Sequence, residues 1–296
     1  MPQTPEPIRT CLVIGHSGFL GRHFCARLRL SHPAITLRGL SHEELDLMAP
    51  QSVDILSGAM DEGTCVVMMA AVKRQLGDDP DVYQANSLMT VNLAKAIRQQ
   101  PPGRLIYLSS AAVYGEDIGN MAITETTVPT PRSYYGLAKL AAEGLLDRAF
   151  GEPAATRLVL VRPTTIYGGD EPDSAYGPAG FAKRAKAGET IPLWGDGSEL
   201  RDFVHVPDAA NILCRLVIDD FAGTLNLVSG VGVSFRDILH AIEKHLGRPA
   251  ALTQKTRSKD KVDQAYDNGL LRRLMPDLRF DSIDDALEVM LSDLRT

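Results

Sequence analysis

Short apolar runs alternate with amphipathic stretches along much of the chain, and this alternation predicts strands separated by helices. The runs are continuous in their apolar character, which is typical of strands buried on both faces. They lie at residues 11–14, 34–37, 65–69, 104–108 and 157–162. The intervening stretches repeat their apolar positions at the helical interval, at residues 19–30, 50–60, 82–99 and 134–150. Strands that alternate with helices are typical of an α/β fold with a parallel sheet covered on both faces.

The first apolar run ends in a glycine-rich turn that opens the first predicted helix. Residues 15–21 read GHSGFLG. Gly15 allows the chain to turn without a side-chain clash, Gly18 lets a phosphate approach the backbone, and Gly21 lets the helix pack closely on the strand. The N–H groups of a helix N-terminus can hold a pyrophosphate, so this order of strand, turn and helix predicts a dinucleotide site.

Two further strand ends bear on the cofactor. An acidic residue at the end of the second strand binds the ribose 2′-hydroxyl of NAD, whereas a basic residue there can meet the 2′-phosphate of NADP. The sequence places Arg38 directly after residues 34–37, with no carboxylate beside it. We therefore favour NADP(H) over NAD(H), although an arginine on a loop is often only solvated. The third strand ends in Ala70-Ala71-Val72, whose small residues permit close approach of a ligand.

A serine, a tyrosine and a lysine follow in the order that a catalytic set needs. Ser110 comes just after the fourth predicted strand, where open α/β sheets place their ligands. Tyr135 and Lys139 are four residues apart at the start of a helix and share a helix face. A nearby ammonium lowers a phenol pKa from about 10, so the tyrosine can exchange a proton with a substrate oxygen that the serine also contacts.

The composition of the chain changes after residue 168, where glycine and proline become frequent. We expect a dinucleotide-binding domain at 1–168 and a smaller α/β substrate-binding portion at 169–296, from which some segments return to the first sheet. Further elements are predicted at residues 209–218, 224–228, 235–246 and 283–294, of which the second is a strand and the others are helices.

The composition of the chain argues against several classes of protein. The chain has 296 residues, 44% of them hydrophobic, and a net charge of -6 without a basic run, which argues against a nucleic-acid partner. No apolar run is long enough to span a membrane, and the polar N-terminus is unlike a secretory signal. We expect the four scattered cysteines to be reduced core thiols of a cytoplasmic protein, and the seven histidines, which lack metal-ligand spacing, to hold no metal.

Together these motifs resemble the extended short-chain dehydrogenases/reductases, the NAD-dependent epimerase/dehydratase family that acts on nucleotide sugars. The resemblance runs from residue 9 to about 288 and is carried by GHSGFLG, LSSAAVYG, YYGLAK, RPTTIYG and GDGSELRDFVHVPD. It implies a Rossmann-type doubly wound parallel sheet and a homodimer that pairs the helix at 82–99 with the helix carrying Tyr135. It also implies Ser110, Tyr135 and Lys139 as the catalytic residues.

The resemblance also implies which residues contact the ligands. With the residues argued above, the cofactor set is Gly15, Gly18, Phe19, Leu20, Gly21, Arg38, Asp46, Leu47, Ala70, Ala71, Val72, Asn86, Tyr135, Lys139 and Pro163. On the substrate side it implies Arg201 and Arg257 as ligands of the diphosphate, Asp260 near the nucleoside, and Thr165. Bidentate arginine suits a phosphate, although surface ion pairs would also account for both arginines.

Two departures from the family pattern bear on the reaction. Dehydratases of the family carry an Asp-Glu pair after the catalytic hydroxyl residue, whereas this chain has Ala111-Ala112. The local sequence is similar to GDP-fucose synthase-like reductases, but Ala112 stands where those enzymes have a cysteine for epimerisation. An alanine moves no proton, so of that activity only the reduction remains.

The resulting hypothesis is an NADP(H)-dependent reductase that delivers hydride to C4 of an NDP-4-keto-6-deoxy sugar, with Tyr135 as proton donor. One alternative is a nucleotide-sugar 4-epimerase with tightly bound NAD(P), against which Arg38 counts. Another is a non-catalytic dinucleotide sensor, which would not need Ser110, Tyr135 and Lys139 together. The nucleotide base and the sugar stay open.

Overall fold

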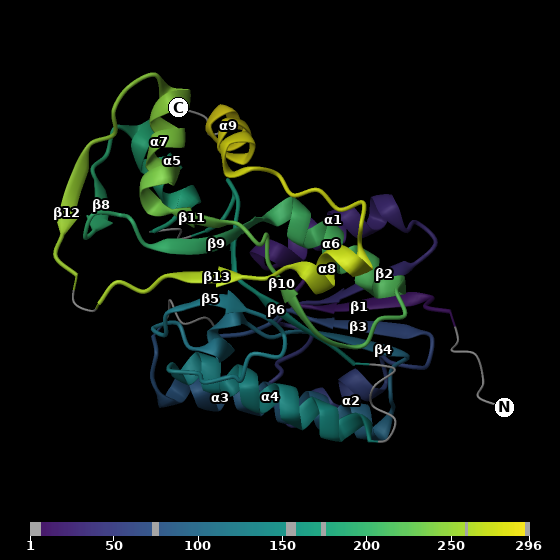
Figure 1. Cartoon of the computed structure of the whole chain (residues 1–296). Helices are drawn as coiled ribbons and strands as arrows, with labels where there is room; N and C mark the ends of the chain where they lie inside the picture. The colour runs from purple at the N-terminus through teal and green to yellow at the C-terminus, as the bar shows by residue number, and fades with distance from the viewer. Residues whose placement is uncertain (1–6, 73–76, 152–157, 173–175, 258–259, 294–296) are drawn as a thin grey trace. The chain divides into compact units, whose positions relative to one another are not determined.

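The chain folds into two compact units, and each unit is built from several separate stretches of the sequence. The computed structural model describes residues 7–72, 77–151, 158–172, 176–257 and 260–293 (Figure 1). The first unit takes residues 1–116, 127–163 and 209–227, and the second takes 117–126, 164–208 and 228–296. The chain passes between the units several times, and residues 209–227 of the expected substrate-binding portion belong to the first unit. Two predicted element ends, Arg157 and Leu294, lie outside the described residues.

A six-stranded parallel sheet forms the centre of the first unit. Its strand order is β10-β6-β4-β3-β1-β2. The bounds are β1 Thr10–Ile14, β2 Thr36–Leu40, β3 Thr64–Met68, β4 Arg104–Leu108, β6 Leu158–Pro163 and β10 Gly223–Leu227. Every residue of β3 and β4 is buried, which explains why their sequences are apolar throughout rather than alternating.

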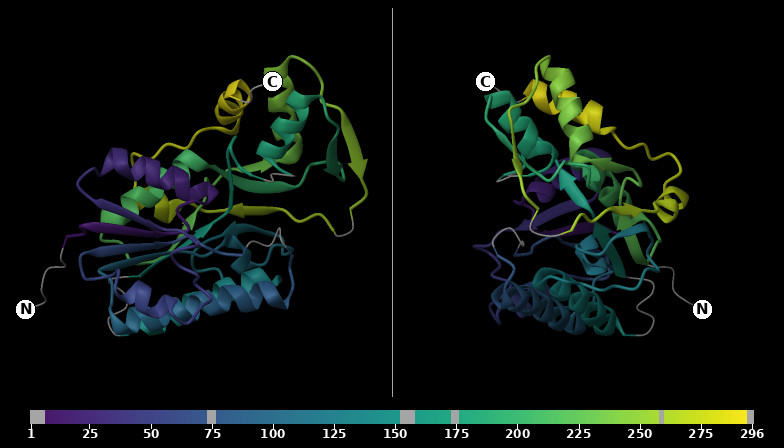
Figure 2. Two further views of the ribbon diagram at one scale, coloured as in Figure 1. Left: turned by 180° about the vertical axis from the view of Figure 1, so that it is seen from behind. Right: turned by 60° about the vertical axis from the view of Figure 1, so that its left-hand side comes forward.

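Helices cover both faces of this sheet, so the fold is of the doubly wound, Rossmann type (Figures 1 and 2). On one face lie α2, α3 and α4, and on the other lie α1 and α6. Their bounds are α1 Phe19–Ser31, α2 Ser52–Ser57, α3 Pro80–Gln99, α4 Tyr134–Phe150 and α6 Val206–Ile218. A short 3₁₀ helix, η2 (Ala111–Tyr114), connects β4 to the following segment.

The strand order places a switch point between β1 and β3. The chain leaves β1 to form β2 on one side and returns to form β3 on the other. The N–H groups of Met69 and Ala70 both donate to the carbonyl of Ile14, at 2.9 and 3.1 Å. Gly15 has φ +93°, and a Cβ there would lie 2.8 Å from the nitrogen of Ala70, so only glycine fits at this crossing.

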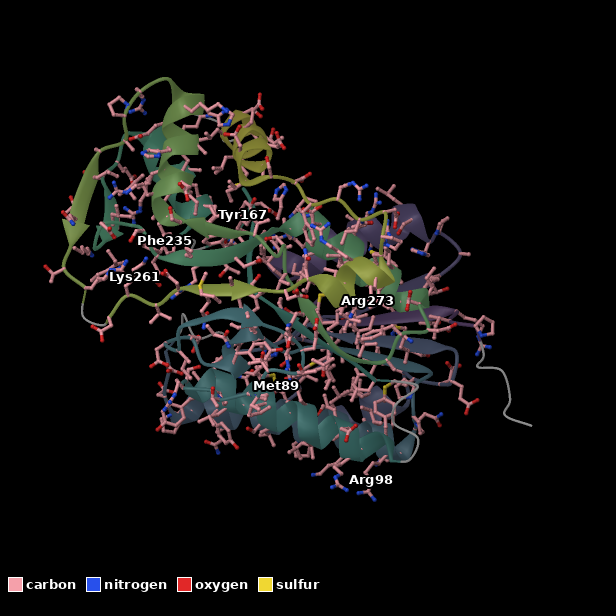
Figure 3. All side chains as sticks on the ribbon, viewed as in Figure 1. Met89, Arg98, Tyr167, Phe235, Lys261 and Arg273 are labelled. Atoms are coloured by element: carbon pink, nitrogen blue, oxygen red, sulfur yellow. The ribbon has the colours of Figure 1, made fainter. Side chains whose placement is uncertain are left out.

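The second unit has small sheets and its own core. Strands β11, β9 and β7 form one sheet, and β12-β8 and β13-β5 form two-stranded ladders. The elements are β5 Asn120–Ile123, β7 Thr165–Tyr167, α5 Pro178–Ala187, β8 Ile191–Trp194, β9 Leu200–His205, β11 Gly232–Ser234, α7 Phe235–Leu246, β12 Leu252–Lys255, β13 Gln264–Tyr266, α8 Gly269–Leu274 and α9 Ile283–Asp293. Tyr167 and Phe235, labelled in Figure 3, belong to this core, where Phe235 lies 5.9 Å from Phe203 between ring centroids.

The structure also bears on two compositional expectations. All four cysteines are free and buried, as expected of core thiols, and Cys11 and Cys65 are register partners on β1 and β3. Among the helices that the structure describes, none combines the length and the apolar character needed to cross a bilayer.

Candidate active site

The N-terminus of α1 is built to receive an anion. Gly18 caps the helix in an extended conformation, no side chain caps it, and the first turn carries no acidic residue. A Cβ on Gly18 would meet only the carbonyl oxygen of Gly15 within 4 Å, at 3.3 Å, so the approach to the backbone is open. The first N–H groups of a helix carry a partial positive charge, which suits a pyrophosphate. The glycine turn therefore fits a dinucleotide.

Gly21 holds the turn and the helix together. A Cβ at this position would lie 2.2 Å from the carbonyl oxygen of Gly15 and 2.8 Å from that of His16. Phe19, the first residue of the helix, is buried, and Leu20 is half-buried. The turn is thus fixed by backbone contact on one side and by core packing on the other.

Asn86 holds the loop that follows β3. Its Oδ1 accepts the N–H of Val72 at 3.1 Å, and its Nδ2 donates to the carbonyls of Val72 at 3.0 Å and Val82 at 2.8 Å. The side chain is 5% exposed. Sequence reasoning placed Asn86 among the cofactor contacts, and in the structure its amide ties Val72 of the loop after β3 to α3.

Asp46 and Leu47 lie on the segment between β2 and α2. Asp46 is exposed, and its Oδ1 accepts the N–H of Met48 at 3.0 Å. Leu47 is buried, and its carbonyl accepts a hydrogen bond from Asn92 of α3 at 2.8 Å. The segment is thereby tied to α3, and Asp46 is the one of the two that faces solvent.

Arg38 lies within β2 rather than after it. The strand runs to Leu40, and Arg38 pairs in register with Leu12 and is exposed. Gly39 made the strand seem to end early, but a Cβ there would lie 2.4 Å from Cγ of His16. The glycine therefore marks a close approach of the His16 ring and not a strand end.

Glu44, a carboxylate close to Arg38, is hydrogen-bonded within its own turn. Glu44 accepts the N–H of Ser41 at 2.9 Å. Hydrogen bonds from Ser41 lower the pKa of Glu44, with smaller contributions from the charges of His16 and Arg38. Arg38 thus lies within the field of one carboxylate that is already committed to a turn.

Close packing of α4 on η2 brings the tyrosine to the serine. Ser133 caps α4 by accepting the N–H of Gly136 at 3.0 Å. A Cβ on Gly136 would lie 2.8 Å from the carbonyl oxygen of Ala112, so glycine permits this approach. The Oγ of Ser110 accepts the N–H of Ala112 at 3.1 Å, and Ser110 lies close enough to Tyr135 to lower the pKa of its phenol.

Lys139 is anchored beside them. Its Nζ donates to the carbonyl of Leu108 at 2.6 Å and lies 5.7 Å from the ring centroid of Tyr135 and 4.7 Å from that of Tyr107. The structure thus brings Ser110, Tyr135 and Lys139 together at the carboxyl end of β4. Pro163 ends β6, the neighbouring strand.

The protonation of this set differs from the sequence-based expectation. Burial raises the pKa of Tyr135 to about 12, and the hydrogen bond with Ser110 offsets only part of that effect. Burial also lowers the pKa of Lys139 to about 7, against the charge of Glu143, which raises it. The expected lowering of the tyrosine pKa is therefore not seen, because burial of the phenol itself raises it.

In the second unit, a carboxylate joins the two predicted phosphate ligands. Glu199 forms ion pairs with Arg201 of β9 and with Arg257, which follows β12. The three side chains are 17%, 23% and 20% exposed, respectively. Thr165 and Asp260 are exposed, and the contacts of the described residues place neither in this cluster. Sequence reasoning missed Glu199, although it lies two residues before Arg201 in GDGSELRDF.

The described residues give no sign of a metal centre: no group of three or more His, Cys, Asp or Glu side chains among them is arranged to hold an ion. The chemistry of the site is carried by the glycine turn and by the serine, tyrosine and lysine.

The fold and this constellation are those of a pyridine nucleotide-dependent enzyme built on a Rossmann-type sheet. A family model described as NAD dependent epimerase/dehydratase family matches residues 11–232. The chain belongs to this family, whose members similar to it act on nucleotide sugars as reductases or epimerases.

Three known proteins show the range of these similarities. A dTDP-4-dehydro-6-deoxy-D-allose reductase from a Streptomyces species is 29% identical over 270 residues, covering 81% of this chain and 82% of the relative. RMD from Pseudomonas aeruginosa, solved with NADPH, matches with a TM-score of 0.81 at 27% identity over 96% of this chain and 98% of that one. UDP-glucuronic acid 4-epimerase from Bacillus cereus, solved with UDP-glucuronic acid and NAD, has a TM-score of 0.83 at 23% identity and the same coverage, a likeness of fold.

Replacing Gly21 by alanine tests the glycine turn. Alanine is favoured over glycine inside a helix by about 1 kcal/mol, but the added Cβ would strike the carbonyl oxygen of Gly15. We expect Gly21→Ala to lower the melting temperature and to weaken the binding of a pyridine nucleotide at least about tenfold, because the turn must shift. Thermal unfolding and fluorescence titration measure the two effects.

Gly144 of α4 supplies the matched control, because a Cβ there meets no heavy atom within 4 Å. Gly144→Ala should raise stability by about 1 kcal/mol and leave the affinity for a pyridine nucleotide unchanged. If both substitutions changed the affinity equally, the close approach at Gly21 would not be what shapes the site.

Proposed function

We propose that this chain is an NADP(H)-dependent reductase of an NDP-4-keto-6-deoxy sugar. The observation that carries the proposal is the placement of Ser110 and Lys139 beside Tyr135, at the carboxyl end of β4. Similarity to a reductase of a dTDP-4-dehydro-6-deoxy sugar and to a structure solved with NADPH supports the substrate class and the cofactor. The chain would act as a homodimer in the cytoplasm.

The chain's own residues would hold the cofactor. The turn at residues 15–21 would bind the pyrophosphate, the loop at 70–72 would lie against it, and Arg38 would meet the 2′-phosphate. Lys139 would hold the nicotinamide ribose, with Pro163 nearby at the end of β6. When bound, the reduced nicotinamide supplies the hydride that is added to the C4 carbon of the ketone.

Tyr135 would supply the proton. As the C4 carbonyl becomes a hydroxyl, the phenol O–H gives its proton to the oxygen, and Ser110 hydrogen-bonds the same oxygen. A pKa of about 12 keeps Tyr135 protonated at neutral pH, which suits a donor. Water then returns a proton to the phenolate, so the overall reaction consumes one NADPH and one proton for each ketone reduced.

Arg201 and Arg257 would bind the diphosphate of the substrate. Glu199 holds both guanidinium groups, so they are already gathered in one place. Guanidinium suits phosphate oxygens by geometry and by charge. The same carboxylate would compete with the diphosphate for the two arginines.

Loss of reduced-nicotinamide absorbance on a panel of NDP-4-keto-6-deoxy sugars, with NADPH and NADH in parallel, tests the reaction. Stoichiometric consumption of NADPH on one sugar is the expected result. No consumption on any sugar, with a nucleotide that is released only on denaturation, would instead indicate the 4-epimerase.

Tyr135→Phe tests the proton donor. Removal of one hydroxyl should lower turnover by about a hundredfold or more, because general acid catalysis contributes about 10²–10⁴-fold. NADPH affinity should stay nearly unchanged, since the phenol ring remains in place. Steady-state turnover and fluorescence titration measure both, and full activity of the variant would refute this role for Tyr135.

Arg38→Ala tests the cofactor preference. A charge-assisted hydrogen bond contributes about 1.5–3 kcal/mol, so the Kd for NADPH should rise about tenfold to a hundredfold. The Kd for NADH should not change, and Arg29→Ala, which removes another arginine from the first unit, should change neither. An equal loss of affinity for both cofactors on Arg38→Ala would argue against a 2′-phosphate contact.

Glu199→Gln tests the anion site. The substitution removes the negative charge between two arginines, so the affinity for a nucleoside diphosphate should increase by about tenfold, or about 1.4 kcal/mol. Glu189→Gln, at an exposed ion pair with Arg184, is the matched control and should have no effect. Calorimetric titration with GDP, dTDP and UDP measures the change; unaltered affinity for all three would place the diphosphate elsewhere.

A further inference from the structure

A buried ion pair lies directly behind the candidate catalytic set in the first unit. Glu143 is one helical turn after Lys139 on α4, and therefore on the same helix face. Arg162 of β6 donates to both of its carboxylate oxygens, through Nε at 2.9 Å and Nη2 at 2.5 Å. The side chains of Arg162 and Glu143 are only 7% and 6% exposed.

The pair ties together the segments that carry the catalytic residues. Ser109, which precedes Ser110, donates to Oε1 of Glu143 at 2.5 Å. Arg162, which precedes Pro163, also donates to the phenol oxygen of Tyr114 in η2, at 2.9 Å. The end of β4, α4 and the end of β6 thus meet at the carboxylate of Glu143, and η2 joins them through Arg162.

The network continues to the edge of the sheet. The hydroxyl of Tyr114 donates to Oδ1 of Asn226 on β10 at 2.7 Å, and the Arg162 guanidinium lies 5.0 Å from the Tyr114 ring centroid. A buried ion pair adds little net stability compared with apolar side chains of similar volume. Its bidentate form does fix the relative placement of the elements that bear it.

Glu143 is also the carboxylate that acts on Lys139. The titratable side chains that face the Lys139 ammonium are Tyr107 of β4 and Tyr135 and Glu143 of its own helix. Arg162 donates both to this carboxylate and to the phenol oxygen of Tyr114. Burial drives the pKa of Lys139 down to about 7, and the charge of Glu143 opposes that fall.

We propose that Glu143, held by Arg162, is a positioning residue that fixes Ser109 and Ser110 against α4 and favours the ammonium form of Lys139. The effect on turnover rests on the proposed function. The effect on Lys139 does not, because it belongs to the protein without substrate.

The experiment compares three variants with the unaltered chain. Glu143→Gln removes the charge and leaves Arg162 unpaired, so it risks misfolding; the double variant Glu143→Gln with Arg162→Met removes both charges and avoids this. Asp147→Asn is the matched control, since Asp147 is exposed one turn further along α4. The titration of Lys139 is followed by the ¹³Cε shift of lysine-labelled protein, assigned with Lys139→Arg, and the pH profile of kcat is measured alongside.

In the double variant, the Lys139 midpoint should fall below its value of about 7 in the unaltered chain, because the ammonium loses its carboxylate. The alkaline limb of the kcat profile should move to lower pH in the same direction. At neutral pH kcat should fall by about tenfold to a hundredfold, as expected when catalytic groups are misplaced, with a smaller change in KM. Asp147→Asn should leave the Lys139 midpoint and the kcat profile unchanged.

An unchanged Lys139 midpoint in a folded double variant would overturn the proposal, as would a loss of kcat with no change in its pH profile, which a merely structural role would give. If the unaltered chain reduces no NDP-4-keto-6-deoxy sugar, the proposed function fails, and the Lys139 titration still decides this inference.

Discussion

The close approach of two backbone segments at the carboxyl ends of β1 and β3 is the constraint on which the first unit depends. One carbonyl, that of Ile14, accepts two N–H groups from the end of β3, and Gly15 turns in the space that remains. Because β1 lies between β2 and β3, this crossing is also the switch point of the sheet. The turn leads directly into the N-terminus of α1, whose first N–H groups have no partner within the helix.

A second close approach, between α4 and η2, positions the candidate catalytic residues. Gly136 lets α4 rest on the carbonyl of Ala112, which sets Tyr135 beside Ser110. Helical spacing then places Lys139 and Glu143 on successive turns of the same face. A single helix thus carries a phenol, an amine and a carboxylate in a row, and its distance from β4 is set by one glycine.

The sequence predicts local features of this site well and long-range partners poorly. Apolar runs and helical spacing predicted β4 and α7 to the residue, and the catalytic order of serine, tyrosine and lysine led to groups that do meet. The end of β2 was placed too early, because a glycine under the His16 ring looks like a strand end. Glu143 was not found, because its partner Arg162 is distant in sequence and no local spacing signals the pair. Glu199 was missed although its partner Arg201 is two residues away, because its role in joining Arg201 to the distant Arg257 appears only in the folded chain.

The protonation of Tyr135 suits proton donation. Burial raises the pKa of this phenol to about 12, so the phenol is protonated at neutral pH and can give its proton to an oxygen that becomes an alkoxide, which is a stronger base than a phenolate. Reduction of a C4 ketone needs this step, and so does the reductive half of an epimerisation at C4. The two reactions differ in the fate of the cofactor, which a reductase consumes and an epimerase returns to its starting state.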